Sequence, residues 1–171
     1  MKHATFMLIA LSAALLAAPS MAFAHCQIPC GIYNDPARFV LLEEHVTTIE
    51  KSMAQIQALA KEATPNWNQI VRWVNNKEAH ADELTEIVTF YFMAQRVKPA
   101  DPSNRAAQPK YLREITLLHQ MVVAAMKAKQ TTDLEHCAKL RELIAKFKAS
   151  YLGEHARPAT EHGHTHDPSH R

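Results

Sequence analysis

Apolar residues recur every three or four positions over most of this chain of 171 residues, and that spacing restricts the fold to packed helices. No stretch shows the strict alternation that is typical of a half-buried strand. The first helix is predicted from Asp35 to about Ala60, with Asp35 as its N-cap and Pro36 as its first helical residue. Its apolar stripe consists of Phe39, Leu42, Val46, Ile49, Met53 and Ile56.

Three further stripes follow the first. A second helix is predicted from near Asn66 to about Val97, and a proline-rich connection over residues 98–109 leads to a third helix. Thr132 and Glu135 have capping-box spacing and predict a fourth helix that stops at Gly153. The stripes are Trp67, Ile70, Val74, Ala81, Leu84, Val88 and Tyr91, then Tyr111, Ile115, Leu118, Val122 and Ala125, then Cys137, Leu140, Ile144, Phe147 and Tyr151. Four such helices joined by short links predict an all-α four-helix bundle.

The first 24 residues have the features of a cleaved export signal. A short basic start precedes an apolar run over Phe6–Ala18, and Ala22 and Ala24 supply the small residues that a signal peptidase recognises. The apolar run has 13 residues, too few to span about 30 Å of hydrocarbon as a helix. We therefore expect cleavage between Ala24 and His25 and a periplasmic or secreted product.

The mature chain then divides into a bundle domain over residues 25–153 and a tail over residues 154–171. The tail contains five histidines and two prolines without apolar periodicity, and we expect it to be disordered. The net charge of +2 reveals no basic face, which argues against nucleic-acid binding. The three glycines are scattered, so a dinucleotide or phosphate loop is excluded as well.

The residues that follow the predicted cleavage bond have the donors of a metal site. Once Ala24 is removed, His25 offers a free amine and an imidazole, and Cys26 offers a thiolate and its backbone amide nitrogen. Pro29 can turn the chain so that Cys30 supplies a second thiolate. These donors make a planar N2S2 set that suits nickel(II) or copper(II), with the imidazole approaching from above. A Cys26–Cys30 disulfide is the plain alternative in an oxidising compartment.

The segment His25-Cys26-x-x-Pro29-Cys30-Gly31-x-Tyr33 resembles the N-terminal hook of the nickel-containing superoxide dismutases, a family of helical bundles assembled as homohexamers. The resemblance implies that a nickel ion cycling between Ni2+ and Ni3+ disproportionates superoxide to oxygen and hydrogen peroxide. By the same resemblance, His25, Cys26 and Cys30 would be the metal ligands, and Tyr33 would guard the pocket for the small anion. Gly31 would let the backbone turn closely.

The family pattern is incomplete in this chain. In the family, a glutamate early in the first helix and an arginine of a neighbouring subunit hold the axial imidazole. Residues 41–44 offer no clear match for that glutamate, and Arg72 or Lys77 could supply the cation. Tyr91 is predicted to pack in the core, although family members pair a helix tyrosine with the hook tyrosine.

The remaining candidates have simpler interpretations. Cys137 lies on an apolar stripe and is predicted to be a buried core thiol. The helical histidines share no i, i+4 pattern, so we interpret them as surface or core residues; they are His45, His80, His119 and His136. A different function, a periplasmic nickel or copper carrier or sensor that uses the hook and the tail, stays open.

Processing gives the first testable prediction. An uncleaved chain has an amide in place of the amine of His25, so it loses one ligand and one chelate ring and should bind nickel poorly. N-terminal sequencing of the natural product should start at His25, and nickel binding should appear only after cleavage. A different first residue would contradict the proposed ligand set.

Overall fold

The computed structural model describes residues 29–153, so the predicted export signal, His25, Cys26 and the histidine-rich tail lie outside the described residues. Within residues 29–153 the chain is helical and contains no strand. The elements are α2 (Asp35–Leu59), α3 (Trp67–Glu86), the π-helix η1 (Ile87–Arg96), α4 (Gln108–Gln130) and α5 (Glu135–Leu152). None of these helices combines the length and the hydropathy that a membrane crossing requires.

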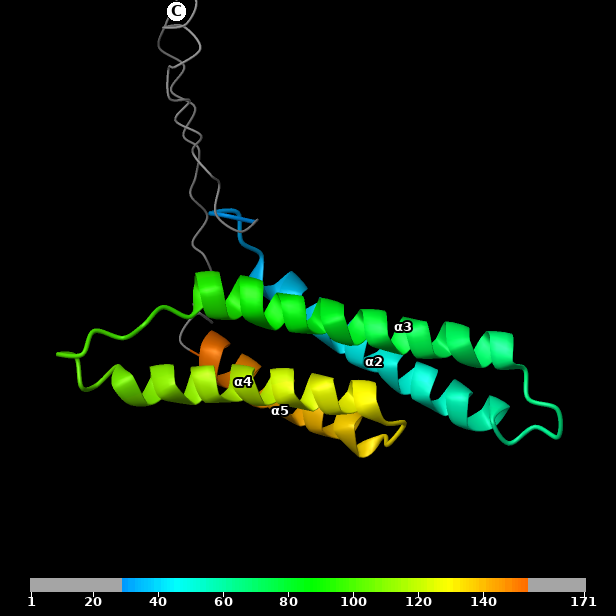
Figure 1. The fold of residues 1–171 in the computed structure, drawn as a ribbon. Helices are drawn as coiled ribbons and strands as arrows, with labels where there is room; N and C mark the ends of the chain where they lie inside the picture. The colour runs from blue at the N-terminus through cyan, green and yellow to red at the C-terminus, as the bar shows by residue number, and fades with distance from the viewer. Residues whose placement is uncertain (1–28, 154–171) are drawn as a thin grey trace, which may run out of the picture.

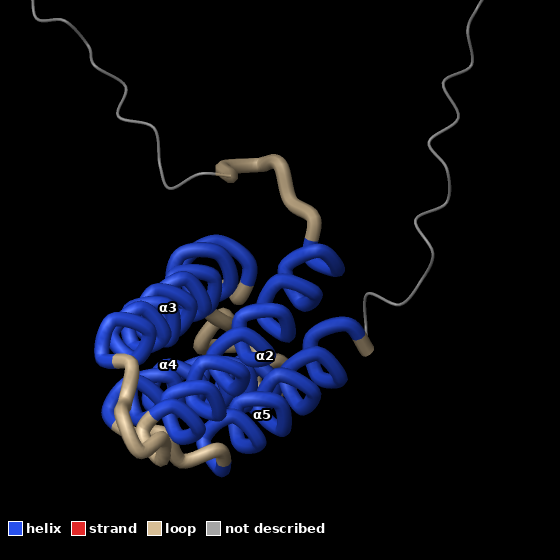
Figure 2. The backbone as a smooth tube through the Cα atoms, turned by 90° about the vertical axis from the view of Figure 1, so that its right-hand side faces the viewer, coloured by secondary structure: helices blue, strands red, loops and turns tan. Residues whose placement is uncertain are grey.

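Consecutive helices run antiparallel, and α3 continues directly into η1 as one long rod (Figure 1). Each helix packs on two neighbours: α2 lies against α3 and α5, and α4 lies against α3 and α5. Viewed from the end, the helices are grouped around one common axis (Figure 2), and their buried apolar side chains form a single cluster. This arrangement brings the start of α2 and the ends of η1 and α5 to one end of the bundle. The all-α four-helix prediction is confirmed.

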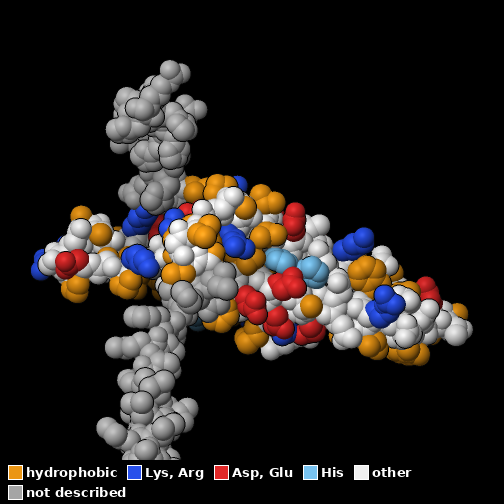
Figure 3. Space-filling view, turned by 90° about the horizontal axis from the view of Figure 1, so that it is seen from above, with side chains coloured by type: hydrophobic (Ala, Val, Ile, Leu, Met, Phe, Trp, Pro, Cys, Tyr) orange, Lys and Arg blue, Asp and Glu red, His pale blue; other side chains and the backbone are white. Residues whose placement is uncertain are grey.

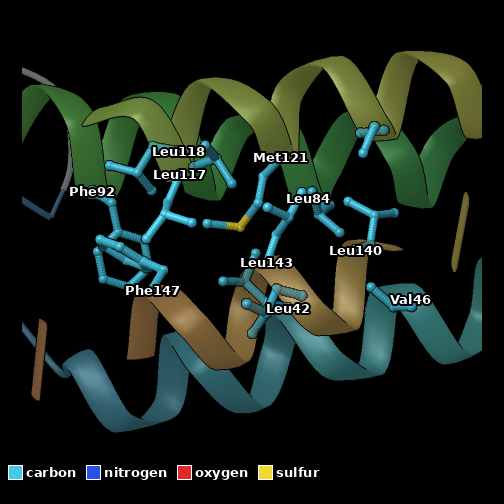
Figure 4. Close-up of a cluster of buried hydrophobic side chains, with 14 of the residues drawn as sticks. Leu42, Val46, Leu84, Phe92, Leu117, Leu118, Met121, Leu140, Leu143 and Phe147 are labelled. Atoms are coloured by element: carbon cyan, nitrogen blue, oxygen red, sulfur yellow. The ribbon is translucent and has the colours of Figure 1, made fainter. Parts of the chain in front are cut away.

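The core consists of the apolar stripes that the spacing predicted. Leu42, Leu84, Leu118 and Leu140 are fully buried, one from each of the four helices (Figure 4). Toward the end where α2 begins, aromatic rings replace the aliphatic side chains, with ring centroids 5.0–6.2 Å apart. These rings belong to Phe39, Phe92, Phe147 and Tyr151. Aromatic pairs at these separations add stabilisation beyond the area they bury.

Several predicted helix ends were wrong in detail. Asn34, not Asp35, caps α2, because its side chain accepts from the backbone N–H of Ala37, and Asp35 is the first helical residue. The capping box of Thr132 and Glu135 does not form. Glu135 begins α5, and its N–H donates to the Asp133 side chain. The Thr132 carbonyl instead accepts from Gln57 of α2.

Trp67 was wrongly assigned to the core stripe. It is the first residue of α3 and is 68% exposed. A residue at a helix end can continue the apolar spacing while the neighbouring helix no longer reaches it. The second helix also departs from the prediction of one continuous α-helix, since its last ten residues form η1.

Lys77 has a structural role in the middle of the bundle. It is 3% exposed, and its Nζ donates to the carbonyl oxygens of Ala128 and Lys129 at the end of α4. These are carbonyls that a helix end leaves without intrahelical partners. The suggestion that Lys77 supplies a cation to the axial imidazole is therefore wrong.

Replacing Lys77 tests this helix end. Lys77→Met keeps the length of the side chain but leaves the carbonyls of Ala128 and Lys129 without their donor, so the free energy of unfolding should fall by about 1–3 kcal/mol. Urea denaturation provides the measurement. Lys51→Met, at an exposed position on α2, is the control and should change stability by less than about 0.5 kcal/mol. Equal effects of the two substitutions would contradict the capping role.

Candidate metal centre

A tight turn over residues 29–32 precedes α2. The Ile32 N–H donates to the Pro29 carbonyl over 2.7 Å, and Gly31 has a φ of +84°. A positive φ at the third residue is the mark of a type II turn and favours glycine. Gly31 therefore has the role that the sequence suggested. The turn leaves Cys30 exposed at its second position.

Tyr33 fastens this turn to the bundle. Its ring meets the ring of Tyr91 edge to face at 5.8 Å, and the Arg96 guanidinium lies 4.3 Å from its centroid. Its hydroxyl donates to Gln95 Oε1 at 3.4 Å. Tyr33 is 37% exposed, so one side of the ring stays open to solvent. The pairing of Tyr33 with Tyr91 is the one that the family resemblance suggested for a helix tyrosine.

Asp35 connects three helices at this end of the bundle. Arg96 binds its carboxylate through two nitrogens, Nε at 2.9 Å and Nη2 at 2.6 Å. The Tyr91 hydroxyl donates over 2.6 Å and the Tyr151 hydroxyl over 2.9 Å. The carboxylate thus receives four hydrogen bonds from η1 and α5, and its side chain is 13% exposed. Hydrogen bonds to charged groups are among the stronger ones in proteins.

The hydrogen bonds around Asp35 set the protonation states of the cluster. Burial acts to raise the pKa of Asp35, but the hydrogen bonds from Arg96, Tyr91 and Tyr151 outweigh it and hold that pKa below its ordinary value. Burial, with the Asp35 carboxylate, raises the pKa of Tyr91 to about 12. The same two causes raise the pKa of Tyr151. Both phenols therefore stay protonated and act as donors at neutral pH.

The π-helix η1 places two hydrogen-bond partners of Asp35 on the same side of the helix. A π-helix closes each turn with one residue more than an α-helix, so Tyr91 and Arg96, five residues apart, come to nearly the same side. The side chains of Thr85 and Thr89 bond the carbonyls four residues before them, and Gln95 bonds the Phe90 carbonyl. Such bonds compete with the regular α pattern. The apolar spacing alone gave no signal of this segment.

A pocket of about 280 Å³ lies between α2 and the rod of α3 and η1. Pro29 of the turn borders it, and Arg38 stacks over the Tyr91 ring in its wall at 4.8 Å. His45, Glu83 and Glu86 also line it. The pocket therefore extends from the turn along the outer surface of the two helices.

A pair of histidines that the sequence did not predict joins α2 to α3. Nδ1 of His45 lies 2.9 Å from Nδ1 of His80, and Glu83 Oε2 lies within 3.5 Å of both atoms. His45 comes from α2, whereas His80 and Glu83 are one turn apart on α3. The only signal in the sequence was the i, i+3 spacing of His80 and Glu83, because the contact with His45 depends on helix packing.

The two cysteines of the described part of the chain differ sharply. Cys137 is fully buried with its Sγ 3.7 Å from the sulfur of Met53, and burial raises the pKa of its thiol to about 11. It is a core residue, as predicted. Cys30 is exposed on the turn. Of the four predicted site residues, the structure thus places Cys30 and Tyr33 together at the end of the bundle, while His25 and Cys26 lie outside the described residues.

Comparison with known proteins gives one match. The model of the family described as nickel-containing superoxide dismutase matches residues 20–155. The chain belongs to this family. The match includes the hook residues from His25 to Tyr33 and all four helices. No curated protein and no solved structure matches the chain.

Membership in the nickel-containing superoxide dismutases settles the class of the protein. It is an oxidoreductase that acts on superoxide, and its cofactor is nickel. The donors available in this chain suit that ion, since an exposed thiol on a tight turn can join others in a square-planar set. The raised pKa of Cys137 keeps that second thiol protonated in the core.

Asp35→Asn tests the hydrogen-bond cluster around Asp35 at this end of the bundle. The change removes the charge that Arg96 and both phenols bind, so the free energy of unfolding at pH 7 should fall by about 1.5–3 kcal/mol. Because the pKa of Asp35 is lowered in the folded state, the wild-type advantage should be present above the ordinary pKa of 3.8 and shrink as the pH falls through the folded value.

Denaturant unfolding between pH 3 and pH 7 measures that difference. Asp82→Asn is the control: Asp82 pairs with Lys129 on an exposed surface, and such a pair contributes about 0–1 kcal/mol. A difference between wild type and Asp35→Asn that is independent of pH would contradict the electrostatic role of this carboxylate.

Proposed function

We propose that this protein disproportionates superoxide to oxygen and hydrogen peroxide at a nickel ion held by its processed N-terminus. His25 would supply its amine and its imidazole, Cys26 its amide nitrogen and thiolate, and Cys30 the second thiolate. The observation that carries the proposal is the exposed Cys30 on a type II turn, inside a family match that begins before His25. When bound, nickel supplies a one-electron redox couple. Thiolate and amidate donors lower the potential of this couple into the range in which superoxide can both reduce and oxidise the ion.

The described residues would serve this reaction by position. Tyr33 directly follows the turn that carries Cys30 and is held by Tyr91, Gln95 and Arg96, so its phenol would limit what reaches the hook. Arg96 stacks on that ring while its charge is paired with the Asp35 carboxylate, so it would hold the phenol in place. Asp35 would act as a positioning residue, since it fixes Arg96 and Tyr91 and through them Tyr33.

We further propose export and assembly. The export signal predicted for residues 1–24 supports a periplasmic or secreted protein that signal peptidase matures. A homohexamer, which the family resemblance implies, would cover apolar side chains on the outside of the bundle. Trp67 and Val71, one turn apart on α3, are 68% and 55% exposed. Light scattering of the processed protein after size-exclusion chromatography should give the mass of six chains, and a monomer would contradict the assembly.

Serine substitutions test the ligand assignment with a matched control. Cys30→Ser removes a thiolate, so superoxide turnover should fall to the level of the protein without nickel, whereas Cys137→Ser should keep nearly wild-type activity. Pulse radiolysis measures turnover, and elemental analysis measures bound nickel. A Cys30→Ser variant with nickel bound and wild-type turnover would contradict the assignment.

The same two measurements separate the enzyme from the carrier. A nickel or copper carrier would bind metal after processing but would not accelerate the loss of superoxide above the rate of the free ion. The geometry favours the enzyme because three neighbours fix the position of Tyr33. A carrier, which has to release its metal, gains nothing from a fixed phenol beside the metal site.

A further inference from the structure

The His45–His80 pair and Glu83 form a compact cluster of metal-binding atoms that includes none of the hook residues. The three atoms, two imidazole nitrogens and one carboxylate oxygen, all lie within 4.8 Å of one another. The side chain of His45 is 12% exposed, that of His80 is 29% exposed, and that of Glu83 is 54% exposed. The cluster therefore lies at the edge of the core, with Glu83 on its solvent side.

The separations within the cluster fit a tetrahedral ion. Three ligand atoms about 2.1 Å from such an ion lie about 3.4 Å from one another. The observed separations are 2.9 Å between the two nitrogens and 3.4 and 3.5 Å from the nitrogens to Glu83 Oε2. The two imidazoles need to move apart by only a few tenths of an ångström.

The chemical environment favours a cation that prefers imidazole. Two nitrogens and one carboxylate suit Zn2+ and its first-row neighbours, whereas Mg2+ and Ca2+ prefer oxygen ligands only. Burial, together with the neighbouring His80, lowers the pKa of His45 despite the opposing effect of Glu83, so its ring is neutral at neutral pH. Acidic side chains surround the histidines on this face (Figure 3), and Glu86 lines the same pocket as His45.

We propose that His45, His80 and Glu83 form an auxiliary binding site for one divalent first-row metal ion, with Zn2+ as its representative, distinct from the nickel ligands of the hook. The set of two histidines and one glutamate leaves a fourth tetrahedral position for water. His45 and Glu83 both line the pocket that Pro29 borders, so solvent reaches that position. The ion would cross-link α2 to α3.

The test compares the response of full-length variants to Zn2+ alone. Zn2+ should raise the thermal midpoint of the wild-type bundle, because an ion that binds only the folded state stabilises it. His45→Ala and His80→Ala should lose that rise and should bind one equivalent of Zn2+ fewer in equilibrium dialysis. His119→Ala, at an exposed position on α4, is the control and should behave as the wild type.

Each comparison is made within one protein with and without Zn2+, so a lower stability of a variant does not obscure the result. The hook and tail are unchanged in all four proteins, and their Zn2+ binding cancels in the difference. His80 is more exposed than His45, so His80→Ala disturbs the packing least. The same stoichiometry and the same rise of the midpoint in all four proteins would overturn the proposal and leave the cluster as a hydrogen-bonded histidine pair.

Discussion

The candidate-site end of this bundle depends on the hydrogen bonds to the Asp35 carboxylate. The carboxylate accepts them from Arg96, Tyr91 and Tyr151, and so connects the start of α2 to the ends of η1 and α5. Because α2 runs antiparallel to both η1 and α5, its start meets their ends at one place, and the hook turn emerges directly above it (Figure 1). A buried carboxylate with this many donors stays ionised, which fixes the geometry of every group that contacts it.

The π-helix explains how one rod serves both the core and the candidate site. Val88 and Phe92 of η1 are fully buried in the core, while Tyr91 and Arg96 meet at Asp35. An α-helix would place residues five positions apart on different sides, so the wider turn lets both contact one carboxylate. π-segments are rare and occur often at functional sites, and here the segment holds the ring of Tyr33 through Tyr91, Gln95 and Arg96.

The number of helices, their order and most of the core could be predicted from the sequence. Apolar residues spaced three or four positions apart show which face of each helix is buried. The sequence also pointed to Cys137 as a core thiol and to Gly31 as a turn residue, since burial and positive φ leave local marks. Three features could not be predicted: the hydrogen-bond cluster around Asp35, the contact of His45 with His80, and the cap formed by Lys77. Each joins residues at least 35 positions apart, and their meeting depends on how the helices pack. The π-helix escaped detection for another reason: its apolar spacing also fits an α-helix.

The proposed function requires nickel bound by two thiolates of the processed N-terminus, one of them Cys30. X-ray absorption at the nickel K edge of the processed, nickel-loaded protein measures this coordination directly. Two sulfur ligands together with nitrogen ligands are expected in the first coordination sphere. A first sphere of nitrogen and oxygen alone would contradict the proposed function.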